Sequence, residues 1–140
     1  MKLSAIYQIF LDCQSVTTDS RNCPDGSLFI ALKGESFNGN AFAKLALDSG
    51  CAFAIIDEIQ YAIEGDQRYI LVDDCLQTMQ QLANYHRRQL GTRVIGITGT
   101  NGKTTTKELI SSVLCQNHNV LYTLGNLNNH IGVPTTLLRL

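Results

Sequence analysis

The residues most able to do chemistry lie where an apolar run at residues 94–97 ends in glycines, a lysine and threonines. Residues 98–104 read TGTNGKT, which predicts a short buried strand, a tight turn and a helix starting at about Thr104. Backbone N–H groups at such a turn and helix N-terminus converge on an anion, and the helix dipole adds to the attraction. The stretch is interpreted as a phosphate-binding loop.

Two side chains here suit a nucleoside triphosphate and its metal ion. Lys103 would reach the terminal phosphates, and Thr104 is placed to ligate the Mg²⁺ that bridges them. The usual motif has a glycine five residues before Gly102, where this sequence has Ile97. An ordinary glycine turn before a helix is the alternative, but the strand pattern, the Gly-Lys-Thr order and the helical continuation together favour nucleotide binding.

Composition narrows the class of partner. The 140 residues suffice for one domain, or for one small domain and part of another. The net charge of -1 argues against a nucleic-acid surface, so we expect small-molecule partners.

No apolar run is long enough to span a membrane and no signal-peptide pattern is complete, so we expect a cytoplasmic protein without membrane insertion. The five cysteines lack a C-x-x-C pair and predict reduced thiols.

Hydrophobic patterns predict an α/β fold with a parallel sheet. Apolar runs predict strands at 27–33, 52–56 and 69–72, beside a β-prone segment at 15–21, and helical spacing predicts helices at 4–11, 41–49 and 75–90. Gly91 caps the last helix, so we place one domain at 1–91 and the start of a second at 92–140. That second part has a predicted helix at 105–116, a strand at 120–122 and a helix from 135.

Two polar segments separate the predicted helices and strands. Residues 34–40 hold two glycines, two asparagines and Phe37, which fits a ligand loop and a connector equally well. Residues 123–134 hold three asparagines, which also form turns readily.

Motifs from three parts of the chain together resemble the Mur ligase family. GTNGKTT at 99–105 resembles the ATP loop of these ligases and of folylpolyglutamate synthase, which lack the first glycine of the usual motif. TDSR at 18–21, GSLFIALKG at 26–34 and FNG at 37–39 resemble the first domain of the ligases that add the third residue and the terminal dipeptide to the peptidoglycan stem. Between those two, YTLGNLNNHIGVP at 122–134 looks like the enzyme that adds D-alanyl-D-alanine.

The resemblance implies an ATP-dependent amide ligase of peptidoglycan precursor synthesis. ATP would phosphorylate the carboxylate of a UDP-N-acetylmuramoyl tripeptide, D-alanyl-D-alanine would attack the acyl phosphate, and Mg²⁺ would neutralise the developing charge. It implies a small N-terminal α/β substrate-binding domain followed by the beginning of a P-loop α/β ATP-binding domain. The family's main catalytic residues are expected beyond Leu140, so we expect this segment to be inactive alone. We expect a monomer.

The resemblance also assigns candidate site residues. Thr104 is the metal-binding candidate, and it also belongs to the ATP-binding set Gly99, Thr100, Asn101, Gly102, Lys103, Thr104 and Thr105. The set for the UDP-linked substrate is Thr18, Ser20, Glu35, Ser36, Phe37, Asn126, Asn128 and Asn129. Two alternatives stay open: another Mur-type ligase, either third-residue-adding or folylpolyglutamate-type, and a non-catalytic module that binds a UDP-sugar or nucleotide.

Overall fold

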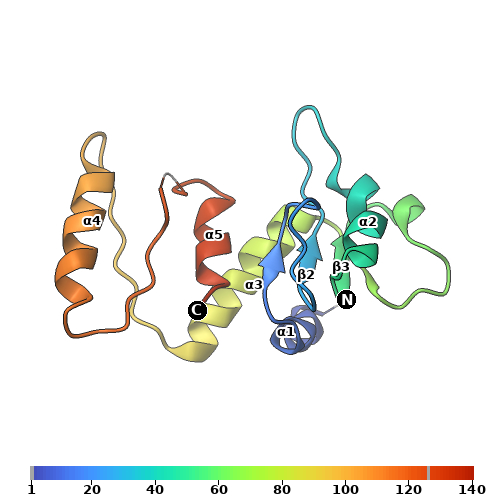
Figure 1. Ribbon diagram of the computed structural model, residues 1–140, viewed down its shortest axis with the longest axis horizontal. Coiled ribbons are helices and arrows are strands. Elements are labelled where there is room, and N and C mark those ends of the chain that lie inside the picture. The colour runs from blue at the N-terminus through green and yellow to red at the C-terminus, as the bar shows by residue number, and fades with distance from the viewer. Residues whose placement is uncertain (1, 126) are drawn as a thin grey trace.

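The computed structural model describes residues 2–125 and 127–140, and a parallel four-stranded sheet forms its centre (Figure 1). The register pairs Val16 with Leu28, Leu28 with Phe53, and Ala54 with Tyr69. This arrangement confirms the predicted α/β class. In sheet order the strands are β1 (Val16–Thr17), β2 (Leu28–Ile30), β3 (Phe53–Ile56) and β4 (Tyr69–Leu71).

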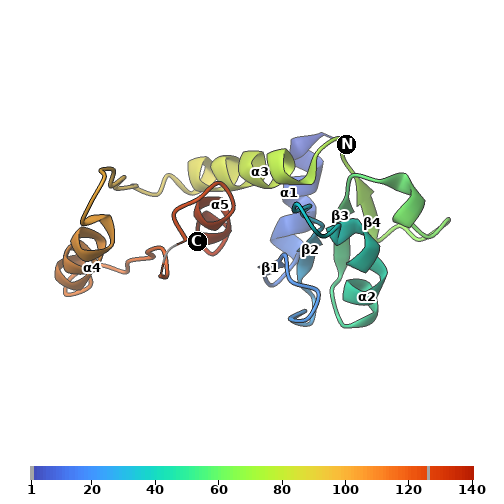
Figure 2. The same cartoon turned by 90° about the horizontal axis from the view of Figure 1, so that it is seen from above.

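The two central strands are buried because helices and loops cover the sheet. All three residues of β2 are buried, as are the last three of β3. Parallel strands covered on both faces read as continuous apolar runs, which is the pattern that predicted them. The helices α1 (Leu3–Asp12) and α3 (Cys75–Leu90) pack against each other, while α2 (Ala43–Asp48) packs on β2 and β3 (Figures 1 and 2). Short 3₁₀ turns at Gly39–Phe42 and Ile59–Tyr61 complete the connections.

The helix α3 forms over the predicted residues because both of its ends carry strong signals. The Asp74 carboxylate accepts a hydrogen bond from the N–H of Gln77 at 2.7 Å, which caps the N-terminus. Gly91 ends the helix with a φ of +64°, a left-handed conformation that favours glycine. Between these caps Met79, Leu82 and other apolar side chains face the core.

The last third of the chain packs against this helix. The helix α5 (Gly132–Leu137) packs along α3, and Leu138 after it is only 5% exposed and belongs to the hydrophobic core. The Gln80 side chain also donates to the His130 carbonyl at 3.0 Å. Residues on both sides of Gly91 are therefore joined by packing as well as by sequence.

The predicted strands at 94–97 and 120–122 are wrong for this structure. Residues 92–99 and 119–124 have no regular secondary structure, and Ile95 is 62% exposed. A strand is stabilised by hydrogen bonds to a neighbour, and none of the described strands lies in that part of the chain. The helix α4 (Lys103–Leu114) forms nevertheless, because its hydrogen bonds are local.

No helix among residues 2–125 and 127–140 is long and apolar enough to cross a membrane. All five cysteines are free thiols. Cys51 and Cys75 are buried, whereas Cys115 on the surface is exposed.

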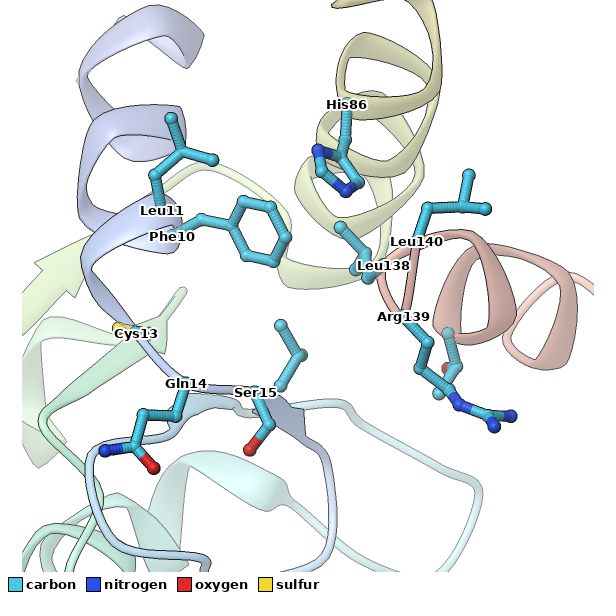
Figure 3. A pocket seen from close by; sticks show the side chains of 11 residues that line it. Phe10, Leu11, Cys13, Gln14, Ser15, His86, Leu138, Arg139 and Leu140 are labelled. Atoms are coloured by element: carbon cyan, nitrogen blue, oxygen red, sulfur yellow. The ribbon is translucent and has the colours of Figure 1, made fainter. Parts of the chain in front are cut away.

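We expect the stability of the fold to depend on pH through His86. It lies in the wall of a cavity of about 350 Å³ between α1, α3 and the end of α5 (Figure 3), with Nδ1 3.2 Å from the Tyr7 hydroxyl. Burial lowers the pKa of His86, against a smaller opposite effect of a hydrogen bond with the Leu140 backbone. The neutral ring therefore makes its full contribution to stability at pH values above the unfolded-state pKa of about 6.5. This contribution is lost as the pH falls through the pKa of His86 in the folded state.

Chemical denaturation between pH 7 and pH 5 tests this, with His86→Gln as the variant that cannot titrate. The free energy of unfolding of the unaltered chain should fall more steeply with decreasing pH than that of the variant. Parallel slopes would contradict the assignment.

Candidate functional site

The turn before α4 has the backbone geometry that its glycines allow. Gly99 has a φ of +148° and Gly102 a φ of +74°, both in the region that side chains disfavour. Gly102 occupies the N-cap position of α4 and supplies no side-chain hydrogen bond to the first turn. The N–H groups of that turn are thus available to an anion, and the helix dipole favours negative charge there.

The side chains of this loop face solvent, apart from Lys103, which is half-buried. The Lys103 ammonium folds back and donates to the Gly99 carbonyl, so it lies across the turn. Thr104 and Thr105 are exposed in the first turn of α4, and Thr100 and Asn101 are exposed just before it. The structure therefore places the seven predicted ATP-binding residues in one continuous surface at the helix N-terminus.

Lys107, one turn into α4, has a contact that sequence reasoning missed. Its ammonium donates to the Thr123 carbonyl at 2.6 Å and pairs with Glu108 at 2.8 Å. The same Nζ lies 5.7 Å from the centre of the Tyr122 ring, within range of a cation–π interaction. Lys107 thus holds α4 beside segment 119–124.

The predicted contacts for the UDP-linked substrate follow two neighbouring strands. Thr18 and Ser20 come directly after β1, and the loop with Glu35, Ser36 and Phe37 comes after β2. Because β1 and β2 are parallel, these segments meet at the same carboxyl edge of the sheet. That edge is where open α/β sheets bind ligands.

The turn after β1 is ordered by its own side chains. The Thr17 hydroxyl donates to the Asn22 carbonyl at 2.8 Å, and the Arg21 guanidinium donates to both carboxylate oxygens of Asp19 at 2.9 and 2.8 Å. The hydrogen bonds from Arg21 lower the pKa of Asp19 to about 2. Thr18 and Ser20 are therefore carried by a closed, hydrogen-bonded turn.

Phe37 lies at the tip of the loop after β2 and is 55% exposed. Its ring rests on Gly34, where an added Cβ would come within 2.5 Å of the Phe37 Cε1. The Gly34 N–H also donates to the Phe37 carbonyl at 3.0 Å. The absence of a side chain at Gly34 thus lets the aromatic ring pack against the loop backbone.

A polar network below this loop was missed by sequence reasoning. The Asp57 carboxylate, which follows β3, accepts from Asn40 Nδ2 at 2.8 Å and lies 3.1 Å from Lys33 Nζ. It also accepts from the N–H of Cys75 at 3.2 Å, at the start of α3. Burial alone would raise the pKa of Asp57, but these hydrogen bonds outweigh it and the pKa is lowered. Acidic residues directly after a buried strand were the available signal.

The asparagine-rich turn is described only in part, because Asn126 lies outside the described residues. Asn128 is exposed, and the Asn129 side-chain oxygen accepts from the N–H groups of Ile131 at 3.1 Å and Gly132 at 2.7 Å. Asn129 thus orders the entry to α5. Both asparagines line a hollow of about 430 Å³ against α3.

No group of three or more histidine, cysteine or acidic side chains among residues 2–125 and 127–140 could hold a metal ion. Figure 1 shows the loop after β2, the turn before α5 and the turn before α4 projecting toward the same side of the molecule. These three segments, distant from one another in the sequence, therefore lie on one side of the molecule.

The parallel sheet and the glycine turn ahead of α4 define the class as an α/β protein with a glycine-rich turn at a helix N-terminus. Residues 12–87 match the family described as "Mur ligase family, catalytic domain", and residues 97–140 match the "Mur ligase middle domain". The first match alone covers more than half of the chain. The chain belongs to the Mur ligase family.

Curated relatives agree with this family. The chain is 48% identical over 123 residues to a UDP-N-acetylmuramoyl-tripeptide–D-alanyl-D-alanine ligase of Bacillus subtilis. The aligned residues cover 88% of this chain and 27% of that protein. It is 43% identical over 126 residues to the ligase of the same name from Escherichia coli, covering 90% of the chain and 27% of the relative. The chain therefore spans about a quarter of the length of these relatives.

Solved structures match the same fold. MurF from Acinetobacter baumannii superposes with a TM-score of 0.84 at 34% identity, covering 99% of this chain and 33% of that one. MurF ligase from Thermotoga maritima in complex with ADP gives a TM-score of 0.80 at 31% identity, covering 92% of this chain and 29% of the other.

Substitution of Gly102 tests the turn before α4. Gly102→Ala should destabilise the turn and the first turn of α4 by about 1–2 kcal/mol, because its φ of +74° is unfavourable for alanine. An added Cβ would meet nothing within 4 Å, so the cost is conformational rather than steric. Amide hydrogen exchange of α4 measures the effect.

Gly96→Ala is the matched control, since that site is also open but has no left-handed φ. Equal exchange rates in the two variants would show that the conformation of Gly102 is not required.

Proposed function

We propose that this chain is part of an ATP-dependent carbon–nitrogen ligase that adds D-alanyl-D-alanine to UDP-N-acetylmuramoyl tripeptide in peptidoglycan precursor synthesis. The observation that carries the proposal is the 48% identity to a relative of that name, over 88% of this chain. The names of the relatives favour this reaction over the third-residue-adding and folylpolyglutamate-type alternatives. Residues 1–91 would bind the UDP-linked substrate, and residues 92–140 would begin the ATP-binding domain.

ATP fits the turn before α4. Gly99 and Gly102 have no side chain that would obstruct a phosphate, and the N–H groups in the first turn of α4 have no side-chain cap. Lys103 would exchange the Gly99 carbonyl for a phosphate oxygen, since charge-assisted bonds to phosphate are stronger than those to a neutral carbonyl. The ADP complex of the Thermotoga maritima relative supports the choice of nucleotide.

Magnesium would be held mainly by phosphate. The Thr104 hydroxyl is exposed in the first turn of α4, where it would supply one ligand, and no cluster of three or more potential side-chain ligands occurs among the described residues. Mg²⁺ commonly binds through few protein groups together with water and substrate phosphates. The metal would neutralise charge during phosphoryl transfer.

The UDP end of the substrate would bind at the carboxyl edge of the sheet. Thr18 and Ser20 would supply hydroxyls from the turn after β1, and Glu35, Ser36 and Phe37 would contact the nucleotide from the loop after β2. Asn126, Asn128 and Asn129 would lie nearer the muramoyl peptide. The common side to which these loops project supports a substrate that extends from the sheet toward α4 (Figure 1).

The reaction would proceed through an acyl phosphate on the tripeptide carboxylate. In this chain, Lys103 and the N–H groups of α4 would orient and charge-stabilise the transferred phosphate, and the sheet edge would fix the other end of the substrate. We infer a cytoplasmic monomer. The net charge of -1 supports small-molecule partners rather than nucleic acid.

Lys103→Met should weaken Mg-ATP binding at least about tenfold, because a charge-assisted phosphate contact is lost. Isothermal titration calorimetry of the 140-residue chain measures it. Lys44→Met, which removes the same charge from exposed α2, is the control and should bind as the unaltered chain does. Similar affinities for all three proteins would contradict the assigned contact.

A phosphate-release assay tests the whole reaction. With ATP, UDP-N-acetylmuramoyl tripeptide and D-alanyl-D-alanine, the full-length protein should release phosphate and form the pentapeptide product, whereas the 140-residue segment should not. Turnover by the segment would refute its expected inactivity. Failure of the full-length protein with these substrates would refute the assigned reaction, and binding of the UDP-sugar without turnover would favour a binding module.

A further inference from the structure

Asp57 is the most enclosed charged group below the loop after β2. Its side chain is only 4% exposed, although it pairs with Lys33, whose side chain is 48% exposed. Burying a carboxylate is costly, and a buried ion pair is often no more stable than an apolar replacement. The carboxylate is kept in place by specific donors, and these donors lie at the base of the loop and at the start of α3.

Asp57 and Asn40 hold each other in one orientation. Asn40 Nδ2 donates to the Asp57 carboxylate at 2.8 Å, and the Asp57 N–H donates back to Asn40 Oδ1 at 2.9 Å. Asn40 is 1% exposed and ends the loop that begins at Gly34. The last residue of the loop is thus bonded to the end of β3 through both its amide nitrogen and its amide oxygen.

The other residues at the base of the loop join the same network. Asn38 Oδ1 accepts from Asn40 Nδ2 at 2.8 Å, and Asn38 Nδ2 donates to Glu58 at 3.0 Å. Lys33 forms an isolated antiparallel bridge with Asn38, which closes the loop. The base of the loop is therefore clamped from both sides, while Glu35, Ser36 and Phe37 at its tip remain exposed.

We propose that Asp57 is a positioning residue that holds the loop of residues 34–40 in its binding conformation through Asn40 and Lys33. This inference rests on the proposed binding of the UDP end by Glu35, Ser36 and Phe37. A loop fixed at its base loses less conformational freedom when a ligand binds, which raises affinity without any direct contact from Asp57. The same carboxylate accepts from the Cys75 N–H, so the loop base is also bonded to the start of α3.

Calorimetry of the 140-residue chain with UDP-N-acetylmuramoyl tripeptide tests the proposal. Asp57→Ala should weaken binding about tenfold, and Asp57→Asn, which keeps the shape and removes the charge, should weaken it by a smaller factor. Affinity for Mg-ATP should stay within about twofold in both variants. Amide hydrogen exchange at residues 34–40 should accelerate more in Asp57→Ala than in Asp57→Asn.

Asp74→Ala is the matched control, because Asp74 also accepts a backbone N–H of α3 but has no bond to the loop. It should lower the melting temperature while leaving exchange at residues 34–40 and affinity for the UDP-linked substrate unchanged. Equal losses of affinity in Asp74→Ala and Asp57→Ala would overturn the proposal, as would unaltered exchange in both Asp57 variants. If the unaltered chain binds no UDP-linked substrate, the proposed substrate site itself fails, whereas binding unaffected by Asp57→Ala overturns only the positioning assignment.

Discussion

The parallel pairing of β2 with β3 is the constraint on which the rest of this structure depends. Two parallel neighbouring strands must be joined by a crossover connection, which here contains α2. A parallel sheet is also covered on both faces, which explains why the apolar residues of both strands are buried. Parallel direction also brings the residues that follow each strand to one edge. The turn after β1, the loop after β2 and Asp57 after β3 meet there for that reason alone.

The helix α3 connects this sheet with the part of the chain that contains the glycine turn before α4. Its N-terminus is bonded to Asp57 at the sheet edge, and its length packs against α5, which follows the asparagine-rich turn. Leu138 then enters the same hydrophobic core as the strands. This helix, bonded at its N-terminus to the sheet edge and packed along its length against α5, links the loop that would bind UDP to the part that would bind ATP.

The segments around α4 show the difference between local and non-local stabilisation. The helix α4 forms from hydrogen bonds four residues apart and carries its glycine turn with it, although Leu109 and Val113 are 64% and 71% exposed. Residues 94–97 are as apolar as a buried strand, yet they form none, since pairing needs a partner strand. The prediction of a strand at 94–97 failed because the hydrophobic pattern shows only that a segment could be buried. It does not show whether another strand lies beside that segment.

By itself the sequence determined the parallel α/β class, the bounds of α3 and the glycine turn before α4, because apolar runs, the Asp74 cap and the left-handed Gly91 and Gly102 act locally. The motifs also indicated the family that the comparisons show. Only the tertiary structure decided that Asp57, Asn40 and Lys33 form one network and that Leu138 joins the hydrophobic core of the sheet. These tertiary contacts join segments that are distant in sequence. No local pattern specifies which side chains will meet once the sheet has formed.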